Sequence, residues 1–441
     1  MFPVKTTITI GAFVALSAVM PHGVRSAQLR STLTLIQPSV APVIAPVIPK
    51  PLPVPALPVP FKAEPDTTPA PVIPNLEVPP GSLDAFFASL QKKGVTRILH
   101  YGDSPATADS ITSDVRRLLQ QRFGDAGHGF VLIAKPWAWY GHNGIKLDAK
   151  GWEIAPASQK RAPDGFHGLG GVSFRGEPGA VSTVTLPDTS YSGVTIHYLE
   201  QPGGGAFALS SNDTDFATIS TAGAAKTPAF KTVALPEGTR AVQLRVTSGA
   251  VRLFGYRFDK DQPGVQYSSL GINGAQVQML LRYFEPGQWR EALRHEDPGL
   301  VVLNYGTNES IFPAYVEKQY PDELRKVIGR VREALPHSSI LLMAPMDRGI
   351  IDASGQIVTP PILKTLIGVQ RQIAAETGCA FFDTFDAMGG DGTMARWYHS
   401  EPRLVSADFM HPLPAGAAEV GALFEEALVK AYSGSPYAST K

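Results

Sequence analysis

The sequence predicts an α/β fold with a parallel sheet in a three-layer sandwich, interrupted by an inserted β-sandwich. Apolar strand-like runs alternate with helical stretches in residues 82–149 and again in residues 263–433, which is typical of a parallel sheet covered on both faces. In residues 150–262, short alternating runs separated by Gly, Ser, Thr and Pro replace this pattern and favour a β-sandwich. The clearest of these runs span residues 180–187, 193–200, 241–247 and 251–258.

The first 26 residues are typical of an export signal. Lys5 precedes an apolar run over residues 7–20, and small residues around Ser26 place a cleavage site before Ala27. The apolar run is shorter than the roughly 20 residues that a membrane-spanning helix needs. We therefore expect a periplasmic or secreted protein, with an uncleaved membrane anchor at the N-terminus as the alternative.

Residues 27–81 are expected to form a proline-rich linker. Prolines recur from Pro38 to Pro80, and each one fixes φ and lacks a backbone N–H, which disfavours helix and sheet. An extended polyproline II spacer is the expectation, and a recognition sequence for a partner is the weaker alternative. At the other end of the chain, residues 434–441 are expected to be a tail.

Residues 82–149 form the first part of the predicted α/β domain. A helix that begins near Ser82 leads to an apolar run over residues 95–102, whose character suits a buried parallel strand. Ser104 follows that strand, and the helix after it is expected to end at Gly124. Ser104 is therefore expected at a strand-to-helix junction.

Residues 263–433 form the second part of this domain. The expected strands span residues 300–306, 338–345 and 379–385, and the expected helices between them span residues 321–335 and 363–378. A last helix follows His411, because Pro414 suits a first helical turn. Its apolar stripe consists of Val420, Leu423, Phe424, Ala427 and Leu428.

Four short motifs stand at the predicted ends of strands. They are Gly102-Asp103-Ser104, the stretch from Gly271 to Gly274, the stretch "NYGTNES" with Asn308, and Asp408 with His411. In parallel sheets, ligands bind beyond the carboxyl ends of the strands. Chemically, the motifs supply a nucleophile, a base, an orienting acid and oxyanion donors.

The roles follow from the chemistry of each group. A serine hydroxyl is a weak nucleophile until a base takes its proton; His411 would be the base for Ser104, and Asp408 would hold the imidazole in the right tautomer. The backbone N–H groups of Ser104 and Gly274 and the amide of Asn308 would bind the oxyanion. We prefer Gly274 to Gly271 from motif alignment, since either glycine permits close backbone approach.

Each of these residues also has an ordinary structural interpretation. Ser104 alone is more often a helix cap, and Asn308 alone more often holds a turn. Asp103 is expected to be a hydrogen-bonding turn residue rather than an acid–base group. The joint occurrence of four motifs in one order favours catalysis, and the Gly-x-Ser-x-Gly pentad of α/β-hydrolases is absent around Ser104.

The ordered motifs resemble the SGNH, or GDSL, hydrolase family. The stretches "HYGDS" and "RLLQQRFGDAGHGF", together with the inserted β domain, resemble bacterial peptidoglycan O-acetylesterases, in which the insert is similar to a carbohydrate-binding module. The resemblance implies a serine esterase that removes O-acetyl groups from a cell-wall or other exported polysaccharide. Two positions depart from the family pattern: Pro105 stands where relatives often have His or Leu, and Glu309 stands where many have Asp.

A group of aromatic residues is a candidate for substrate binding. His128, Trp137, Trp139 and Tyr140 could line a glycan groove, since aromatic rings stack on sugar faces. Packing between the two domains is the favoured alternative, because large aromatic residues dominate cores and interfaces.

Composition argues against several other functions. Lys+Arg and Asp+Glu are both 39, so the net charge of zero gives no electrostatic case for nucleic acid. The remaining histidines lack metal-ligand spacing, so neither a metal nor another cofactor is expected. The one cysteine, Cys379, cannot form an internal disulfide and is expected to be packed and inert.

Two functions compete with the esterase. A polysaccharide O-acetyltransferase would use the same acyl-serine with a sugar hydroxyl in place of water, and a non-catalytic glycan-binding protein would use mainly the inserted domain. The sequence identifies neither the glycan nor the oligomeric state.

Overall fold

The computed structural model describes residues 74–92, 94–159 and 161–438. The predicted export signal, residues 1–26, and most of the predicted linker lie outside the described residues. The described residues fall in one compact unit. None of the helices in this part of the chain is long and apolar enough to cross a membrane.

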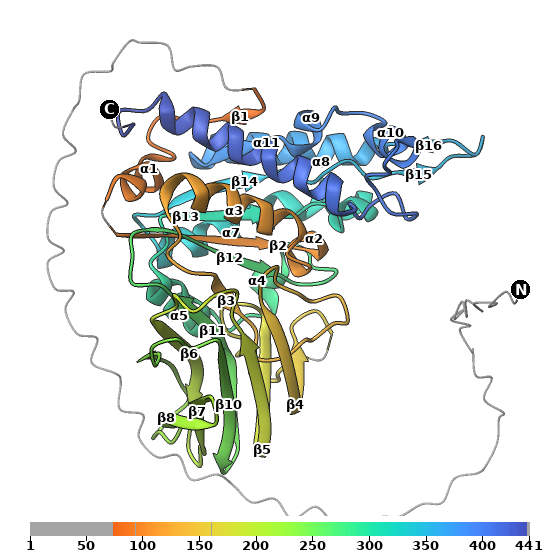
Figure 1. Cartoon of the computed structure of the whole chain (residues 1–441). Coiled ribbons are helices and arrows are strands. Elements are labelled where there is room, and N and C mark those ends of the chain that lie inside the picture. The colour runs from red at the N-terminus through yellow and green to blue at the C-terminus, as the bar shows by residue number, and fades with distance from the viewer. Residues whose placement is uncertain (1–73, 93, 160, 439–441) are drawn as a thin grey trace, which may run out of the picture. The chain divides into compact units, whose positions relative to one another are not determined.

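A mixed six-stranded sheet forms the centre of the α/β domain (Figure 1). Its strands, in spatial order, are β1 (Leu76–Glu77), β17 (Ala380–Phe382), β14 (Ser339–Met343), β13 (Leu300–Asn304), β2 (Val95–Gly102) and β12 (Gly264–Gly271). The five strands from β17 to β12 run parallel. The four strands expected at residues 95–102, 300–306, 338–345 and 379–385 are therefore confirmed.

The edge strand β1 was not expected, because its residues lie in the predicted linker. Leu76 pairs with Phe382 and Glu77 with Phe381 in antiparallel register, so the fold begins before Ser82. A two-residue strand carries no readable periodicity. Its neighbouring prolines are compatible with the edge of a sheet, because one side of an edge strand has no neighbouring strand to which a backbone N–H must donate.

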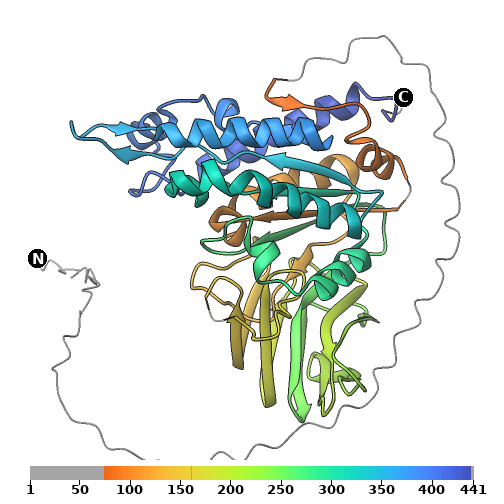
Figure 2. The ribbon, with the colours of Figure 1, turned by 180° about the vertical axis from the view of Figure 1, so that it is seen from behind.

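Helices cover both faces of the sheet (Figure 2). On one face a core cluster joins the strands to α1 (Asp84–Gln91), α3 (Ser110–Phe123) and α11 (Pro414–Ser433). On the other face the core includes α5 (Pro286–Glu296), α7 (Tyr320–Ala334) and α8 (Pro361–Thr377). The shorter helices are α2 (Ser104–Thr107), α4 (Met279–Arg282), η1 (Glu309–Ile311), α6 (Pro313–Lys318), α9 (Thr384–Ala387) and α10 (Thr393–His399).

The middle of the chain forms a second, antiparallel sheet. Its strands are β3 (Gly129–Val131), β4 (Lys146–Pro156), β5 (Val172–Thr185), β6 (Gly193–Glu200), β7 (Ala206–Ser211), β8 (Thr214–Ser220), β9 (Thr227–Ala234), β10 (Ala241–Ser248) and β11 (Val251–Asp259). Hydrogen bonds connect these strands in one path, with β3 on β11 and β4 on β5. The division into two stacked sheets therefore stays a prediction. A separate hairpin joins β15 (Ile350–Ile351) to β16 (Ile357–Val358).

The antiparallel sheet also reaches outside the predicted limits of 150–262. Strand β3 pairs with β11, and β4 begins at Lys146, so both draw on residues expected in the α/β part. Strand β3 is too short for alternation to reveal it.

The helix expected after Ser104 is divided in two. Asp109 has a left-handed φ of 52°, which separates α2 from α3. The Asp109 carboxylate accepts hydrogen bonds from Arg116 Nη1 at 3.0 Å and from the backbone N–H of Asn143 at 2.9 Å. This tertiary contact, which helical periodicity does not report, stabilises the break. As predicted, Gly124 ends α3, with φ of 96°.

Helix α2 lies directly against the ends of β2 and β12. A Cβ on Gly271 would stand 2.0 Å from the backbone nitrogen of Thr107, and a Cβ on Gly102 would stand 3.1 Å from Ala106 Cβ. Both glycines therefore permit a helix–strand contact that a side chain would block or strain.

We predict that Gly271→Ala lowers the free energy of unfolding by about 3 kcal/mol, because the new methyl group meets backbone rather than a movable side chain. Thermal or urea unfolding measures the change. The control is Gly368→Ala in α8, where a Cβ meets nothing within 4 Å and a gain of about 0.5–1 kcal/mol is expected. Equal stability of the Gly271→Ala variant and the unsubstituted protein would contradict the close contact.

Candidate active site

Ser104 is the first residue of α2, immediately after β2. Its Oγ lies 2.8 Å from Nε2 of His411, which is 307 positions away in the chain. The residue in the capping position is Asp103, and no side chain caps this helix. The interpretation of Ser104 as a helix cap is therefore wrong.

The imidazole of His411 links Ser104 to Asp408. His411 Nδ1 lies 2.6 Å from Asp408 Oδ2, and the other carboxylate oxygen accepts the backbone N–H groups of His411 and Met410, each at 3.0 Å. The Ser406 hydroxyl also donates to this oxygen. The structure thus brings together the three residues expected to form the triad. Ser104 comes from the start of α2, and Asp408 and His411 come from the loop before α11.

These hydrogen bonds set the charge of Asp408. Partial burial opposes ionisation, but the donors from Ser406, His411 and Met410 outweigh it and lower the pKa of Asp408 to about 2. A carboxylate is therefore present over the whole neutral range, where it favours the Nδ1–H tautomer of His411.

The ends of three parallel strands meet in register beside this site. Gly102 of β2 pairs with Gly271 of β12 on one side and with Asn304 of β13 on the other. The loops that carry Gly274 and Asn308 follow β12 and β13 directly. All three oxyanion candidates therefore lie at the carboxyl ends of neighbouring parallel strands.

Side-chain and backbone contacts tie these loops together. Asn308 Nδ2 donates to Ala275 O at 2.9 Å and, over a longer 3.3 Å, to Asp103 Oδ2. Gln276 Nε2 donates to Asn308 O at 3.2 Å. Burial raises the pKa of Asp103 to about 6, and its contact with Asn308 supports the expected hydrogen-bonding role.

Gly271 and Gly274 differ in their surroundings. Gly271 is buried at a strand end, whereas Gly274 is exposed on the loop with φ of 69°, and a Cβ there would meet nothing within 4 Å. The preceding residue, Asn273, borders the same cavity as Ser104. This placement favours Gly274 over Gly271 as the residue whose N–H faces substrate.

Glu309 is a part of the site that the sequence did not identify as functional. It is fully buried, and its Oε1 accepts the backbone N–H of Val277 at 2.7 Å, which joins the two oxyanion loops. Its other oxygen has no hydrogen-bond partner among the described residues. Burial raises the pKa of Glu309 to about 8. The only sequence signal was its departure from the Asp of many relatives.

A cavity of about 370 Å³ opens over Ser104. Its lining consists of Ser104, Pro105, Ala108, Ser110, Trp139, Asn273, His411 and Pro412. Trp139 is 54% exposed, and its indole N–H donates to Asn273 Oδ1 at 3.2 Å. The aromatic ring is thus held at the rim of the cavity by the loop that carries Gly274.

The other three aromatic candidates are buried. The favoured packing interpretation fits Trp137 and Tyr140, and the Tyr140 hydroxyl accepts the backbone N–H of Leu132 at 2.9 Å. His128 is buried against His142, with 3.0 Å between Nε2 of His128 and Nδ1 of His142. Only Trp139 of the four borders the cavity over Ser104.

Among the described residues, two groups of side chains have ligand atoms close enough together for a metal ion: Asp109 with His128 and His142, and His197 with His295 and Glu296. A guanidinium group neutralises the carboxylate in each group. Arg116 donates to Asp109, and Arg257 Nη1 lies 3.0 Å from Glu296 Oε1. This charge pairing does not favour a cation, and the expectation of no metal stays a prediction.

Comparison with known proteins confirms the resemblance to the SGNH, or GDSL, hydrolase family. Residues 237–419 match the model of the GDSL-like lipase/acylhydrolase family, a range that contains Gly274, Asn308, Asp408 and His411. No curated protein sequence matches the chain.

One solved structure shares the fold, and others match it much more weakly. A structure described as a peptidoglycan O-acetylesterase in action has a TM-score of 0.69 at 20% identity, covering 80% of this chain and 96% of that one. A salicylyl-acyltransferase from a tetracycline biosynthetic pathway has a TM-score of 0.32 at 13% identity, over 68% and 97%. A carbohydrate esterase family 2 enzyme with a carbohydrate binding domain, from Corynascus thermopiles (Myceliophthora fergusii), has a TM-score of 0.29 at 16% identity, over 65% and 99%.

We predict that Glu309→Gln changes the pH dependence of stability. Because the pKa of Glu309 in the folded protein is about 8, protonation of its carboxyl group favours the folded state. This stabilisation is complete at pH values below the ordinary pKa of glutamic acid. That contribution is lost as the pH rises through about 8. The neutral amide keeps an acceptor for Val277, so the melting temperature of the variant relative to the unsubstituted protein should rise between pH 5 and pH 9, by ~3 °C or more. A pH-independent difference would show that Glu309 does not titrate in this range.

Proposed function

We propose that this chain, whose hydrolase part is of the SGNH type, is an exported serine esterase that removes O-acetyl groups from a cell-wall or extracellular polysaccharide. The observation that carries the proposal is the connected set of Ser104, His411 and Asp408 beneath an open cavity. A hydroxyl, an imidazole and a carboxylate in this order are the parts that acyl transfer through serine requires.

Acylation begins with attack of Ser104 Oγ on the acetyl carbonyl carbon. His411 Nε2 takes the serine proton, and Asp408 stabilises the imidazolium through Nδ1–H. The tetrahedral intermediate collapses when the bond from the acetyl carbon to the sugar oxygen breaks. His411 then gives its proton to that oxygen, so the sugar leaves as an alcohol and the acetyl group stays on Ser104.

Deacylation repeats these steps with water. The water oxygen attacks the carbonyl carbon of the acetyl-serine while His411 takes a proton from the water. His411 then gives a proton to Ser104 Oγ as acetate leaves. The side chains of His411 and Asp408 are 44% and 51% exposed, so solvent has access to the acyl-serine. That exposure supports hydrolysis over transfer to a second sugar.

The oxyanion would form next to three donors, the N–H groups of Ser104 and Gly274 and the amide of Asn308. The amide of Asn308 holds Asp103 only through a long bond of 3.3 Å. Exchange of this weak bond for one to the oxyanion would make the interaction stronger in the transition state than in the free enzyme, which is the condition for catalysis.

The lining of the cavity supports the proposed substrate class. Pro105, Ala108 and Pro412 give it small apolar walls that suit an acetyl methyl group. Exposed Trp139 offers an aromatic face at the rim, where the sugar that carries the acetyl group would lie. The fold shared with a peptidoglycan O-acetylesterase agrees with this assignment. We assign the antiparallel domain, expected to be similar to a carbohydrate-binding module, to glycan binding.

We predict that Ser104→Ala lowers kcat for hydrolysis of 4-nitrophenyl acetate and of acetylated glycans by at least ~10³-fold, because the nucleophile is lost. The matched control is Ser435→Ala, after the far end of the 20-residue helix α11, which should retain full activity. Acetate release from acetylated peptidoglycan, xylan and cellulose fragments identifies the glycan.

The same assay separates the competing functions. Transfer of acetyl to an added glycan, in preference to acetate release, would identify an acetyltransferase. Activity that survives Ser104→Ala would rule out the acyl-serine, and the absence of any Ser104-dependent reaction would favour a binding protein.

We predict that Trp139→Ala raises KM for acetylated oligosaccharides by ~3- to 10-fold, which corresponds to the loss of one aromatic contact. The kcat for 4-nitrophenyl acetate should change less than twofold. Trp139→Phe keeps a ring but loses the hydrogen bond to Asn273. A fall in the kcat of Trp139→Phe would mean that Trp139 positions the Gly274 loop rather than the sugar.

A further inference from the structure

We propose that the loop after β14, residues 344–349, holds two parts of the active site in fixed positions, and that Arg348 is its positioning residue. The first part is the Asn308 loop, residues 305–312, and the second is the base loop, residues 405–413. This inference rests on the proposed function and adds a residue that none of the four motifs contains. It is carried by the hydrogen bonds that the loop makes to both parts.

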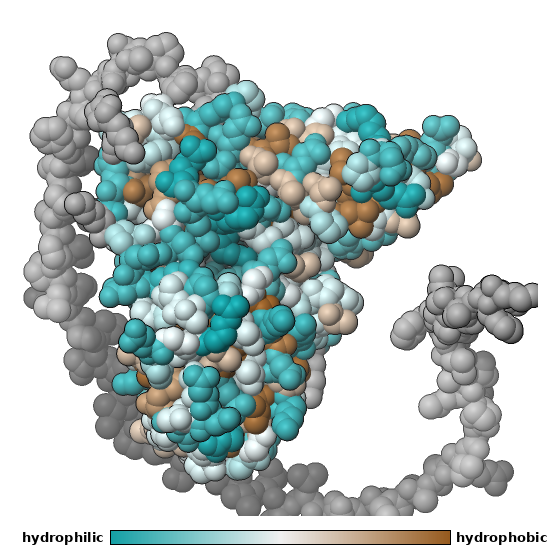
Figure 3. Space-filling model, viewed as in Figure 1, coloured by the Kyte–Doolittle hydropathy of each residue, from teal (hydrophilic) through white to brown (hydrophobic). Residues whose placement is uncertain are grey.

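The loop after β14 is buried although it has no regular secondary structure. All of residues 344–349 are buried, and the chain returns to the surface at Ile350 and Ile351, which are 39% and 54% exposed. These two residues form β15, at the projecting end of the α/β domain, where Figure 3 shows hydrophobic side chains beside hydrophilic ones. Loops usually lie at the surface, because buried polar groups need hydrogen-bond partners. The partners of this loop therefore indicate what it holds in place.

Arg348 binds the Asn308 loop at Ser310. Its Nε donates to Ser310 Oγ at 2.7 Å, and its Nη2 donates to Ser310 O at 2.9 Å. The Ser310 hydroxyl in turn donates to Thr307 O at 2.7 Å. Because Asn308 lies between Thr307 and Ser310 in the chain, the guanidinium group fixes both sides of the turn that carries this proposed oxyanion donor.

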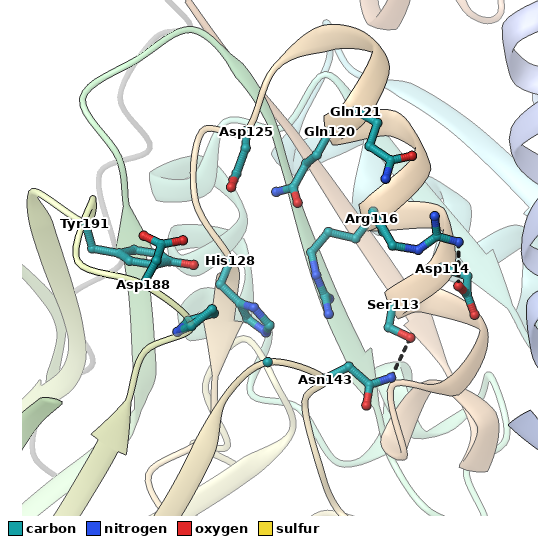
Figure 4. Close-up of a pocket in the computed structure, with 13 residues that line it drawn as sticks. Ser113, Asp114, Arg116, Gln120, Gln121, Asp125, His128, Asn143, Asp188 and Tyr191 are labelled. Carbon is teal, nitrogen blue, oxygen red and sulfur yellow. Dashed lines mark hydrogen bonds and ion pairs between the residues drawn. The ribbon is translucent and has the colours of Figure 1, made fainter. Parts of the chain in front are cut away.

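Arg348 differs from the other buried arginines in what it binds. The buried arginines of the described residues are Arg116, Arg257 and Arg348. Arg116, which lines the cavity drawn in Figure 4, binds Asp109, and Arg257 binds Glu296. Arg348 forms no ion pair with a carboxylate in the described part of the chain. A buried charge without an opposite charge lowers stability, so this arrangement favours a functional role over a stabilising one.

The next residue of the loop binds the base loop. The N–H of Gly349 donates to Phe409 O at 2.7 Å, and a Cβ on Gly349 would stand 2.8 Å from Phe409 Cβ. Phe409 follows Asp408 directly and has a left-handed φ of 57°, which is unusual for a bulky residue. Such strained residues persist only where the surrounding structure fixes them. Gly349 and the ring of Tyr398, whose centroid lies 4.8 Å from that of Phe409, provide this restraint.

Asp347 anchors the loop to the rest of the α/β domain. Its Oδ1 accepts the Thr359 hydroxyl at 2.8 Å, and its Oδ2 accepts the N–H of Met394 in α10 at 2.9 Å. Three consecutive residues thus bind three separate elements, of which one carries an oxyanion donor and another the proposed base. Donor and base act on the same reacting group, so a fixed distance between them preorganises the site for the transition state.

Arg348→Met tests the proposal, because methionine keeps an unbranched side chain but loses both hydrogen bonds to Ser310. We expect kcat for 4-nitrophenyl acetate to fall about tenfold or more, with KM changed less than about threefold. Active sites are counted by complete reaction of Ser104 with diethyl 4-nitrophenyl phosphate, so misfolded protein does not contribute. The control is Arg257→Met, which replaces another buried arginine outside the site and should change kcat per active site less than about twofold.

Two further measurements separate positioning from a merely structural role. Ser310→Ala breaks the same contact, so the double variant should lose no more than about twofold in kcat beyond Arg348→Met alone. Phenylboronic acid, which adds to a catalytic serine as a tetrahedral anion, should bind Arg348→Met about tenfold more weakly or worse. It should bind Arg257→Met with nearly unchanged affinity.

The outcomes distinguish this proposal from the proposed function. If the unsubstituted protein hydrolyses the ester through Ser104, but Arg348→Met keeps its kcat per active site and its affinity for phenylboronic acid, the positioning role alone is overturned. If Ser104-dependent hydrolysis is absent throughout, the esterase fails, and amide hydrogen exchange decides on the loop. Exchange in residues 305–312 should be about tenfold faster in Arg348→Met and unchanged in Arg257→Met. Equal exchange in Arg348→Met and the unsubstituted protein would overturn the proposal.

Discussion

The contact of α2 with the ends of β2 and β12 determines where the chemistry takes place. Helix α2 begins with Ser104 and lies over Gly102 and Gly271, and a side chain at Gly271 would collide with the backbone of Thr107. Because these strands end in register with β13, the loops after all three reach the same edge of the sheet. Only the proposed base, His411, and its partner Asp408 come from elsewhere, and both lie on the loop before α11.

Much of this arrangement follows from the sequence. The strands β13, β14 and β17 are largely apolar runs, β2 has an apolar majority around Arg97 and His100, and α11 shows a clear apolar stripe, so local patterns predict them. The convergence of Ser104 with His411 was predicted from motif order, since parallel strands align their carboxyl ends. The break at Asp109 and the pairing of β1 depend on tertiary contacts with Arg116, Asn143 and β17, which no local pattern encodes. The sequence shows Glu309 only as a departure from the family pattern, because its contact with Val277 depends on burial rather than on residue type.

The antiparallel domain is joined to the α/β domain by buried polar contacts as well as by apolar packing. Arg257 of β11 and His197 of β6 both approach Glu296 Oε1 of α5 at 3.0 Å, and a shared hydrophobic core extends across the two domains. Loss of one partner would leave a buried charge unpaired, which is costly. These contacts hold the antiparallel domain in a fixed position against the α/β domain.

The central claim is that Ser104 forms a covalent acyl intermediate with the help of His411. Acid quenching during turnover of an acetyl ester, followed by peptide mass mapping, tests it most directly. An acetyl group on the peptide that contains Ser104, absent when Ser104 is Ala or His411 is Ala, is the predicted result. Acetate release without an acetylated Ser104, or acetylation at another residue, would contradict the claim.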